Sequence, residues 1–388
     1  MERAWQWNHH SASQGARALG LRLCAAKLGA ASPTSPRVRE PPGALVSVWP
    51  DLGTDTAMWS WSDERVDAPV VPDAHGMLEV DGGAAVYWEQ WGPIDGVPAV
   101  YLHGGPGGGL GTSQYRTRFD LSRTRVVGID QRGCGRSVPH ASDPQVSLSD
   151  NTTTQLIADL ERVREHLGID AWILNGASWG STLGLAYAQE HPHRVLGIVL
   201  YAVTTTSRWE VDWVTEGMRA VFPEAWDRLA SHAEAAGLGY RRGHGRLVEA
   251  YARLMNSADL EVREAASQEW ALWEDTHISI GVGELKRDAR WDDQRFRHAF
   301  VRLTTHYWSH DGFCDPPILE QMHRLEGIPG VLIHGRRDIS SPAAISWELH
   351  RRWHGSTLRI DEGNGHGGTS MAQSWRIAND ELTVQFQR

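Results

Sequence analysis

The chain has 388 residues, of which 41% are hydrophobic and 22% are charged, as is usual for a globular protein. Its formal net charge of −10 argues against a nucleic acid or an anionic membrane as the main partner. No continuous apolar run reaches the roughly 18 residues that a membrane-spanning helix needs.

The cysteines and histidines show neither a disulfide framework nor a metal-binding motif. Cys24, Cys134 and Cys314 are too few and too scattered for such a framework, so we expect a reducing, cytoplasmic setting. The sequence contains no His-Glu-x-x-His and no Cys-x-x-Cys. We therefore expect neither a metal ion nor another cofactor.

Residues 1–65 differ in character from the rest of the chain. Arg17, Arg22 and Lys27 interrupt their only stretch rich in alanine and leucine, which argues against a secretory signal. We expect a disordered N-terminal extension, or translation from a start upstream of the functional one, for which Met58 is a candidate. A transit sequence is the alternative.

Regular structure is predicted from about Gly76. Residues 77–92 (MLEVDGGAAVYWEQWG) alternate apolar and polar side chains around a DGG turn, which predicts a β-hairpin. Residues 97–109 (VPAVYLHGGPGGG) predict a buried strand that runs into a glycine loop at 104–109. Residues 125–129 repeat this design with a second buried strand and a polar loop.

A helix is predicted within residues 151–169. Apolar residues recur there from Leu156 to Leu167 at spacings of four, three and four, with threonines as N-caps and Gly168 after the C-terminus. Residues 171–192 then predict a strand, a tight turn and a helix.

The far end of the chain repeats the alternation of strands and helices. Strands are predicted within 194–203, 328–338 and 356–368, and a helix at 342–353. Buried strands that alternate with helices indicate a parallel sheet covered on both faces. Ligands bind such sheets at the carboxyl ends of the strands.

Between residues 205 and 325 this alternation stops. The helical patterns of that region lie at 213–236, 244–257 and 260–279. We therefore expect a mostly parallel α/β core, formed by residues 66–204 and 326–388, with a helical cap inserted at 205–325 over the strand ends.

The sequence GASWGS at 176–181 places Ser178 between a predicted apolar strand and a helix. Gly176, Ala177 and Gly180 leave room for a strained turn that exposes the serine, as in a nucleophile elbow. Gly-x-Ser-x-Gly alone is a weak match in a chain with 40 glycines. The strand–turn–helix context makes Ser178 a candidate nucleophile.

A serine hydroxyl needs a base, and the base needs a carboxylate that orients it. Asp338 follows one predicted strand, and His366 lies in the glycine loop after the next. The order Ser178, Asp338, His366 is that of α/β hydrolases. The alternative is that Asp338 only caps the helix that begins near Pro342 and that His366 is a surface-loop histidine.

Acyl transfer also needs N–H donors for the developing oxyanion. We expect the backbone amides of Trp179 and Gly105 to supply them; a tight turn without this role is the alternative for the glycine loop. In the sequence DQRGCGRS, Asp130 and Arg132 are expected to support the loop beside the site. Cys134 is expected to confer sensitivity to thiol reagents.

The stretches YLHGGPGGG, DQRGCGRS, NTTTQLIADLERVREHLGI and GASWGSTLGLAYAQEHP together resemble the proline iminopeptidase family of α/β hydrolases. The likeness runs from about residue 70 to the C-terminus. It implies an α/β-hydrolase fold with a helical cap, and a metal-free serine hydrolase that releases an N-terminal residue, usually proline, from peptides. The triad implied by the matching motifs is Ser178, Asp338 and His366.

The resemblance also implies acidic cap residues that hold the free N-terminal ammonium. Glu274 in WALWED matches one of them, and a carboxylate among aromatic rings suits a desolvated cation. A solvated helix residue is the alternative. Thr304, in VRLTTHYW, occupies the place of a second glutamate, which leaves the proline preference open. Asp275 and Asp311 are candidates to replace the missing carboxylate.

The leading hypothesis is a serine exopeptidase that acts on short peptides or amino-acid amides with a free N-terminus. The alternative is an esterase or amidase for uncharged acyl groups, which Thr304 favours. A catalytically silent binding protein is a third hypothesis, against which the complete candidate triad argues.

Overall fold

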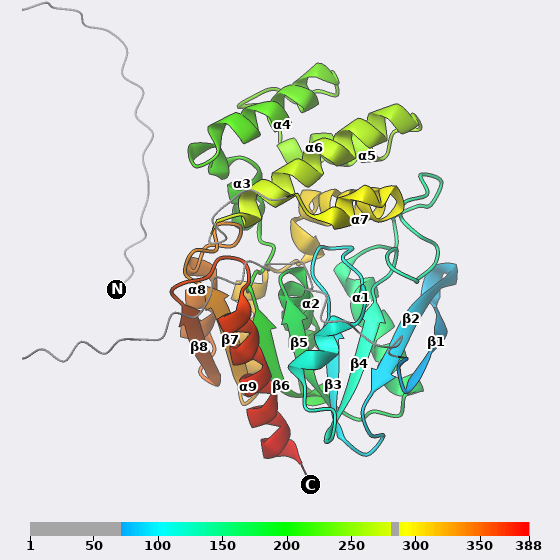
Figure 1. Cartoon of the computed structure of the whole chain (residues 1–388), viewed down its shortest axis with the longest axis vertical. Helices are drawn as coiled ribbons and strands as arrows, with labels where there is room; N and C mark the ends of the chain where they lie inside the picture. Colours follow the sequence, from blue (N-terminus) through cyan, green and yellow to red (C-terminus); the bar gives the residue numbers. More distant parts are fainter. Residues whose placement is uncertain (1–70, 281–286, 388) are drawn as a thin grey trace, which may run out of the picture. The chain divides into compact units, whose positions relative to one another are not determined.

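The computed structural model describes residues 71–280 and 287–387 (Figure 1). The predicted N-terminal extension, residues 1–65, lies outside the described residues. The strands are β1 (Ala74–Val80), β2 (Ala84–Trp91), β3 (Val97–Leu102), β4 (Thr124–Asp130), β5 (Trp172–Ala177), β6 (Val195–Tyr201), β7 (Gly330–Gly335) and β8 (Ser356–Asp361). The helices are α1 (Thr153–His166), α2 (Trp179–Glu190), α3 (Arg208–Thr215), α4 (Pro223–Ala235), α5 (Leu247–Met255), α6 (Leu260–Ile278), α7 (Gln294–Ser309), α8 (Ala344–Arg352) and α9 (Thr369–Phe386).

The strands form one eight-stranded sheet in the order β1-β2-β4-β3-β5-β6-β7-β8. The pairs β1–β2 and β2–β4 are antiparallel, and all later neighbours are parallel. Every residue of β4, β5 and β7 is buried, as expected for parallel strands covered on both faces. The predicted hairpin is confirmed, since Val80 pairs with Ala84 across the turn.

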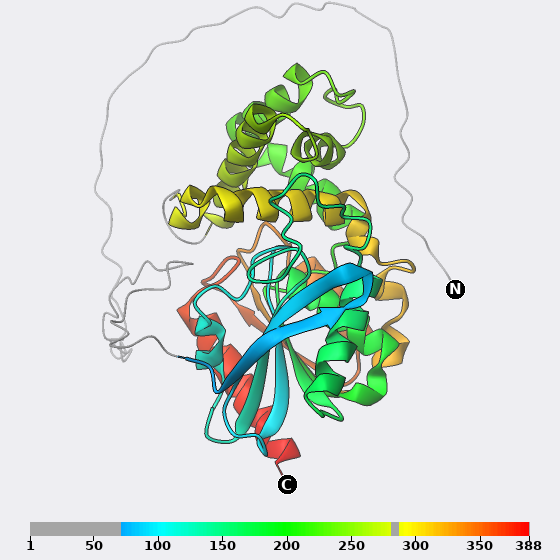
Figure 2. The ribbon, with the colours of Figure 1, turned by 90° about the vertical axis from the view of Figure 1, so that its right-hand side faces the viewer.

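Helices cover both faces of the sheet (Figure 2). One apolar cluster packs α1 and α2 against one face through residues such as Leu160 and Leu183. A separate cluster packs α9 against the other face through Trp375 and Leu382. The predicted α/β architecture is confirmed, and the predicted helix within 151–169 is α1, with Thr152 as its N-cap.

Helices α3–α7 lie above the carboxyl ends of the parallel strands (Figure 1). They share an apolar core of their own, which includes Trp226, Tyr251, Trp270 and Trp273. All five helices fall within the predicted cap region, 205–325. The cap therefore has the packing of a separate layer over the sheet edge where ligands bind α/β proteins.

The prediction of one helix at 213–236 is wrong, because two helices occupy this region. α3 ends at Thr215 and α4 begins at Pro223. A proline lacks the backbone N–H that a helix interior needs and is tolerated in the first turn. Pro223 therefore starts a new helix and does not continue α3.

Helix α2 approaches β3 closely at one glycine. A Cβ atom added to Gly180 would lie 2.0 Å from the carbonyl oxygen of Leu102. Gly184, one turn later on the same helix, has room: its added Cβ would lie 3.5 Å from Leu102 Cδ1. The backbone contact at Gly180 thus fixes how α2 sits on the sheet.

We predict that Gly180→Ala lowers the free energy of unfolding by about 1–3 kcal/mol or more, because the backbone must move apart. Gly184→Ala, the matched control, is expected to raise it by about 0.5–1 kcal/mol, since alanine favours the helix interior. Urea unfolding of both variants measures the difference. Equal stability of the two variants would contradict the close contact.

Candidate active site

Ser178 lies on a strained turn between β5 and α2. Its backbone has φ 53° and ψ −120°, a combination that costs of order 1–3 kcal/mol for a residue with a side chain. Gly176 makes the turn possible, because a Cβ there would lie 2.3 Å from the carbonyl oxygen of Gly180. The amide of Ser178 donates to the carbonyl of Tyr201 on β6 at 2.9 Å, which anchors the turn to the sheet.

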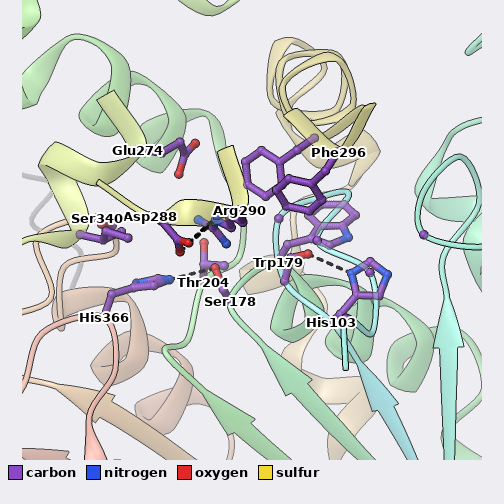
Figure 3. A pocket seen from close by; sticks show the side chains of 18 of the residues that line it. His103, Ser178, Trp179, Thr204, Glu274, Asp288, Arg290, Phe296, Ser340 and His366 are labelled. Carbon is purple, nitrogen blue, oxygen red and sulfur yellow. Dashed lines mark hydrogen bonds and ion pairs between the residues drawn. The ribbon is translucent and has the colours of Figure 1, made fainter. Parts of the chain in front are cut away.

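The loops after β7 and β8 bring an acid and a base to Ser178. His366 Nδ1 lies 2.8 Å from Asp338 Oδ2. On the other side of the ring, His366 Nε2 lies 3.1 Å from Ser178 Oγ (Figure 3). Because the ionised carboxylate only accepts, Nδ1 carries the proton and Nε2 is left to accept from the serine hydroxyl. The three sequence-predicted catalytic residues therefore form one hydrogen-bonded chain.

The charges of Asp338 and His366 stabilise each other. Burial raises the pKa of Asp338, but the nearby His366 charge and its hydrogen bond outweigh burial and hold the pKa below its ordinary value. Burial lowers the pKa of His366, but the charge and hydrogen bond of Asp338, together with the charge of Glu274, raise it above the ordinary 6.5. Asp338 thus stabilises an imidazolium, as a base that accepts a serine proton requires.

The glycine loop lies against the serine. A Cβ atom added to Gly104 would lie 3.2 Å from Ser178 Cβ. Its carbonyl accepts hydrogen bonds from His103 Nδ1 at 2.9 Å and from the Gly108 amide at 3.0 Å. A trans peptide points its N–H away from its C=O, so these bonds fix the direction of the Gly105 N–H. Trp179 follows Ser178 as the first residue of α2.

A buried network links Trp179 to His103 at the start of the glycine loop, and sequence reasoning missed it. Gln131 accepts from Trp179 Nε1 at 2.9 Å and donates through Nε2 to the His103 carbonyl at 3.0 Å. The Gln131 amide also donates to His103 Nε2 at 3.1 Å. Only the fold brings these residues together, since His103 follows β3, Gln131 follows β4 and Trp179 begins α2. The sequence carries no local signal for them.

Ser178 and His366 line a cavity of about 590 Å³ beneath the cap (Figure 3). Glu274 on α6 lines it, although only 7% of the residue is exposed. Its carboxylate accepts from Trp270 Nε1 at 2.9 Å and lies 3.3 Å from His277 Nε2. Burial raises the pKa of Glu274, but its interaction with His277 outweighs burial and lowers it. The cavity therefore holds an ionised carboxylate near the nucleophile.

The structure does not bring Thr304 into the cavity. The residue is fully buried on α7, and its hydroxyl donates to the carbonyl of Pro106 in the glycine loop at 3.0 Å. Asp275, bound to Trp291 Nε1, and Asp311, bound to Arg246, do not line the cavity either.

Other carboxylates line the cavity instead. Asp130 is one of them, and its expected place beside the site is confirmed. Sequence reasoning did not single out the other three, which are Glu210, Asp288 and Asp293. Asp288 and Asp293 lie in the chain between α6 and α7. Nothing in the local sequence distinguishes them from ordinary helix caps.

The loop after β4 has structural roles. Arg132 binds both carboxylate oxygens of Asp159 on α1, at 2.6 and 2.9 Å. Asp130 accepts from the Leu110 amide at 2.7 Å and pairs with Arg136. Burial argues against the expected sensitivity of Cys134 to thiol reagents, because the residue is 1% exposed and burial raises the pKa of its thiol.

Within residues 71–280 and 287–387, no cluster of three or more His, Cys, Asp or Glu side chains has the arrangement of a metal site. Over the same residues, no helix combines the length and the hydropathy that a membrane crossing requires.

Comparisons with known structures show the fold. An esterase from Exiguobacterium antarcticum aligns over 79% of this chain and 98% of its own, with a TM-score of 0.53 at 17% identity. The proline iminopeptidase of Mycobacterium smegmatis aligns over 80% of this chain and 98% of its own, with a TM-score of 0.50 at 16% identity. At such low identity these matches carry the fold alone.

Comparisons of sequence go further. Residues 97–368 match the family model described as alpha/beta hydrolase fold. A probable proline iminopeptidase from Streptomyces coelicolor is 43% identical over 80% of this chain and 96% of its own. A proline iminopeptidase from Arabidopsis thaliana is 38% identical over 81% of each chain. The chain therefore belongs to the proline iminopeptidase family of α/β hydrolases.

Proposed function

We propose that this protein is a serine exopeptidase that releases the N-terminal residue, preferentially proline, from short peptides or amino-acid amides. The observation that carries the proposal is one cavity that contains both the hydroxyl of Ser178, bonded to His366, and the ionised carboxylate of Glu274. A nucleophile beside a buried anion suits a substrate whose free amine is close to its scissile carbonyl. The named relatives support proline as the preferred residue.

The proposed reaction proceeds through an acyl-enzyme. Ser178 Oγ attacks the scissile carbonyl while its proton passes to His366 Nε2, and Asp338 stabilises the resulting imidazolium. The amides of Gly105 and Trp179 hold the oxyanion. His366 then gives the proton to the leaving amine nitrogen as the C–N bond breaks. Water, deprotonated by His366, hydrolyses the ester and regenerates Ser178.

Glu274 confers selectivity for a free amine in this proposal. Its carboxylate pairs with the substrate ammonium in a largely desolvated site, where a charge-assisted hydrogen bond contributes about 1.5–3 kcal/mol. An N-acetyl group removes the charge, so a capped substrate leaves the buried carboxylate without its partner.

A cytoplasmic location is consistent with the free thiols of this protein. Cys134 and Cys314 are both free, as is usual in a reducing compartment.

The substrate test compares the 4-nitroanilides of proline, alanine and N-acetylproline, together with a simple acyl ester. We predict a preference for free proline, loss of turnover in Ser178→Ala, and a fall in kcat/KM of about 10- to 150-fold in Glu274→Gln. Serine-dependent turnover of only the ester or the capped anilide would instead support the esterase or amidase alternative.

The pH test uses phenylmethylsulfonyl fluoride, which reacts with Ser178 without needing the amine site. His366 acts as a base only when neutral, so inactivation should speed up as pH rises through its raised pKa. Glu274→Gln removes a charge that favours the imidazolium, so the acid limb should move to lower pH. An acid limb that stays at the same pH would contradict the effect of the Glu274 charge on the pKa of His366. Glu362→Gln, in an exposed loop, is the matched control.

A further inference from the structure

The cavity contains a cation that the proposed chemistry does not use. Arg290 lines it together with Ser178, Glu274 and His366. It lies in a short 3₁₀ helix, Ala289–Asp292, just before α7. In Figure 3 its side chain lies above Ser178, between Glu274 and the Phe296 ring.

Most other charged groups of the cavity already have partners. Asp130 pairs with Arg136 at 2.7 Å, and Arg136 also binds Glu89. Glu210 accepts from Ser207 in the capping box of α3. The remaining acids are helix caps: Asp293 accepts from the amides of Arg295 and Phe296, and Asp288 from the amide of Arg290.

The Arg290 guanidinium is held in place, but its hydrogen-bonding capacity is not used. Its centre lies 4.3 Å from the Trp291 ring centroid and 5.4 Å from that of Phe300, so aromatic faces support it. Nε is 3.3 Å from Asp288 Oδ2, an ion-pair distance without hydrogen-bond geometry. Among the residues that the structure describes, no side chain or carbonyl accepts a hydrogen bond from the five guanidinium N–H groups.

The charge of Arg290 also acts at both other functional groups. Burial raises the pKa of Glu274, and Arg290 is among the groups that lower it. Burial and the charge of Arg290 both lower the pKa of His366, although Asp338 and Glu274 keep it above its ordinary value. The cation is therefore close enough to the amine site and to the base to be part of one substrate-binding unit.

We propose that Arg290 binds the free α-carboxylate of the leaving amino acid, so that dipeptides with a free C-terminus are the preferred substrates. The inference rests on the proposed function. A dipeptide zwitterion carries an ammonium at one end and a carboxylate at the other, about 7 Å apart when extended. Glu274 and Arg290 present the complementary charges within one cavity, and a guanidinium can bind a carboxylate through two hydrogen bonds.

The test compares L-prolyl-L-alanine with L-prolyl-L-alaninamide, which share the scissile bond and differ only in the terminal charge. In the wild type, kcat/KM for the free acid should exceed that for the amide by about 10-fold or more. In Arg290→Met, which keeps an apolar stem against the rings, this ratio should fall toward one. Arg290→Lys keeps the charge without the planar fork and should retain part of the ratio.

Arg295→Gln is the matched control, because Arg295 is exposed and does not line the cavity. It should leave the acid-to-amide ratio unchanged. Equal hydrolysis of acid and amide by the wild type, or a ratio that survives in Arg290→Met, would overturn the proposal.

Proline 4-nitroanilide separates the two levels of failure. If Ser178-dependent turnover of the anilide is seen, but prolyl-alanine is not preferred over its amide, the exopeptidase proposal stands and the role of Arg290 is refuted. No turnover of any prolyl substrate refutes the exopeptidase, and this inference with it. If Arg290→Met fails to fold, the wild-type ratio still tests the preference for the free acid, and Arg290→Lys tests the role of Arg290.

Discussion

The geometry of the site depends on a backbone contact at the end of β5. Ser178 adopts a strained conformation there, and it can do so only because Gly176 and Gly180 let strand and helix backbones approach within distances that any side chain would prevent. Parallel neighbours on both sides of β5 resist relaxation of the turn. The strain aims the hydroxyl out of the sheet toward the loops after β7 and β8, so the rigid core determines where the reactive atom lies.

Electrostatics add direction to this geometry. Asp338 is buried yet ionised because it faces His366. His366 is partly buried yet more basic than usual because it faces Asp338 and Glu274. The same Glu274 charge is proposed to hold the substrate amine, so binding and base strength are coupled. Thr304 supplies no second carboxylate, and its hydroxyl supports the glycine loop instead. In our account Arg290, which lines the same cavity, binds the opposite charge of the substrate, its free carboxylate.

Local patterns were enough to predict the fold and the candidate triad. Continuous apolar runs predict the buried strands, and the strand–turn–helix context singles out Ser178. Asp338 and His366 follow because the ends of parallel strands meet at one edge. Contacts between distant loops have no such local signature, as Gln131 and His103 illustrate. The same holds for Arg290, whose place in the cavity depends on how the cap packs over the sheet.

The central claim is that Ser178 becomes a prolyl ester during turnover. The most direct measurement is mass spectrometry of protein quenched in acid during hydrolysis of proline phenyl ester, whose reactive leaving group favours accumulation of the intermediate. Our account predicts a single added prolyl group on the peptide that contains Ser178, and none in Ser178→Ala. Enzyme-dependent hydrolysis with the prolyl group on another residue, or in Ser178→Ala at the wild-type rate, would contradict it.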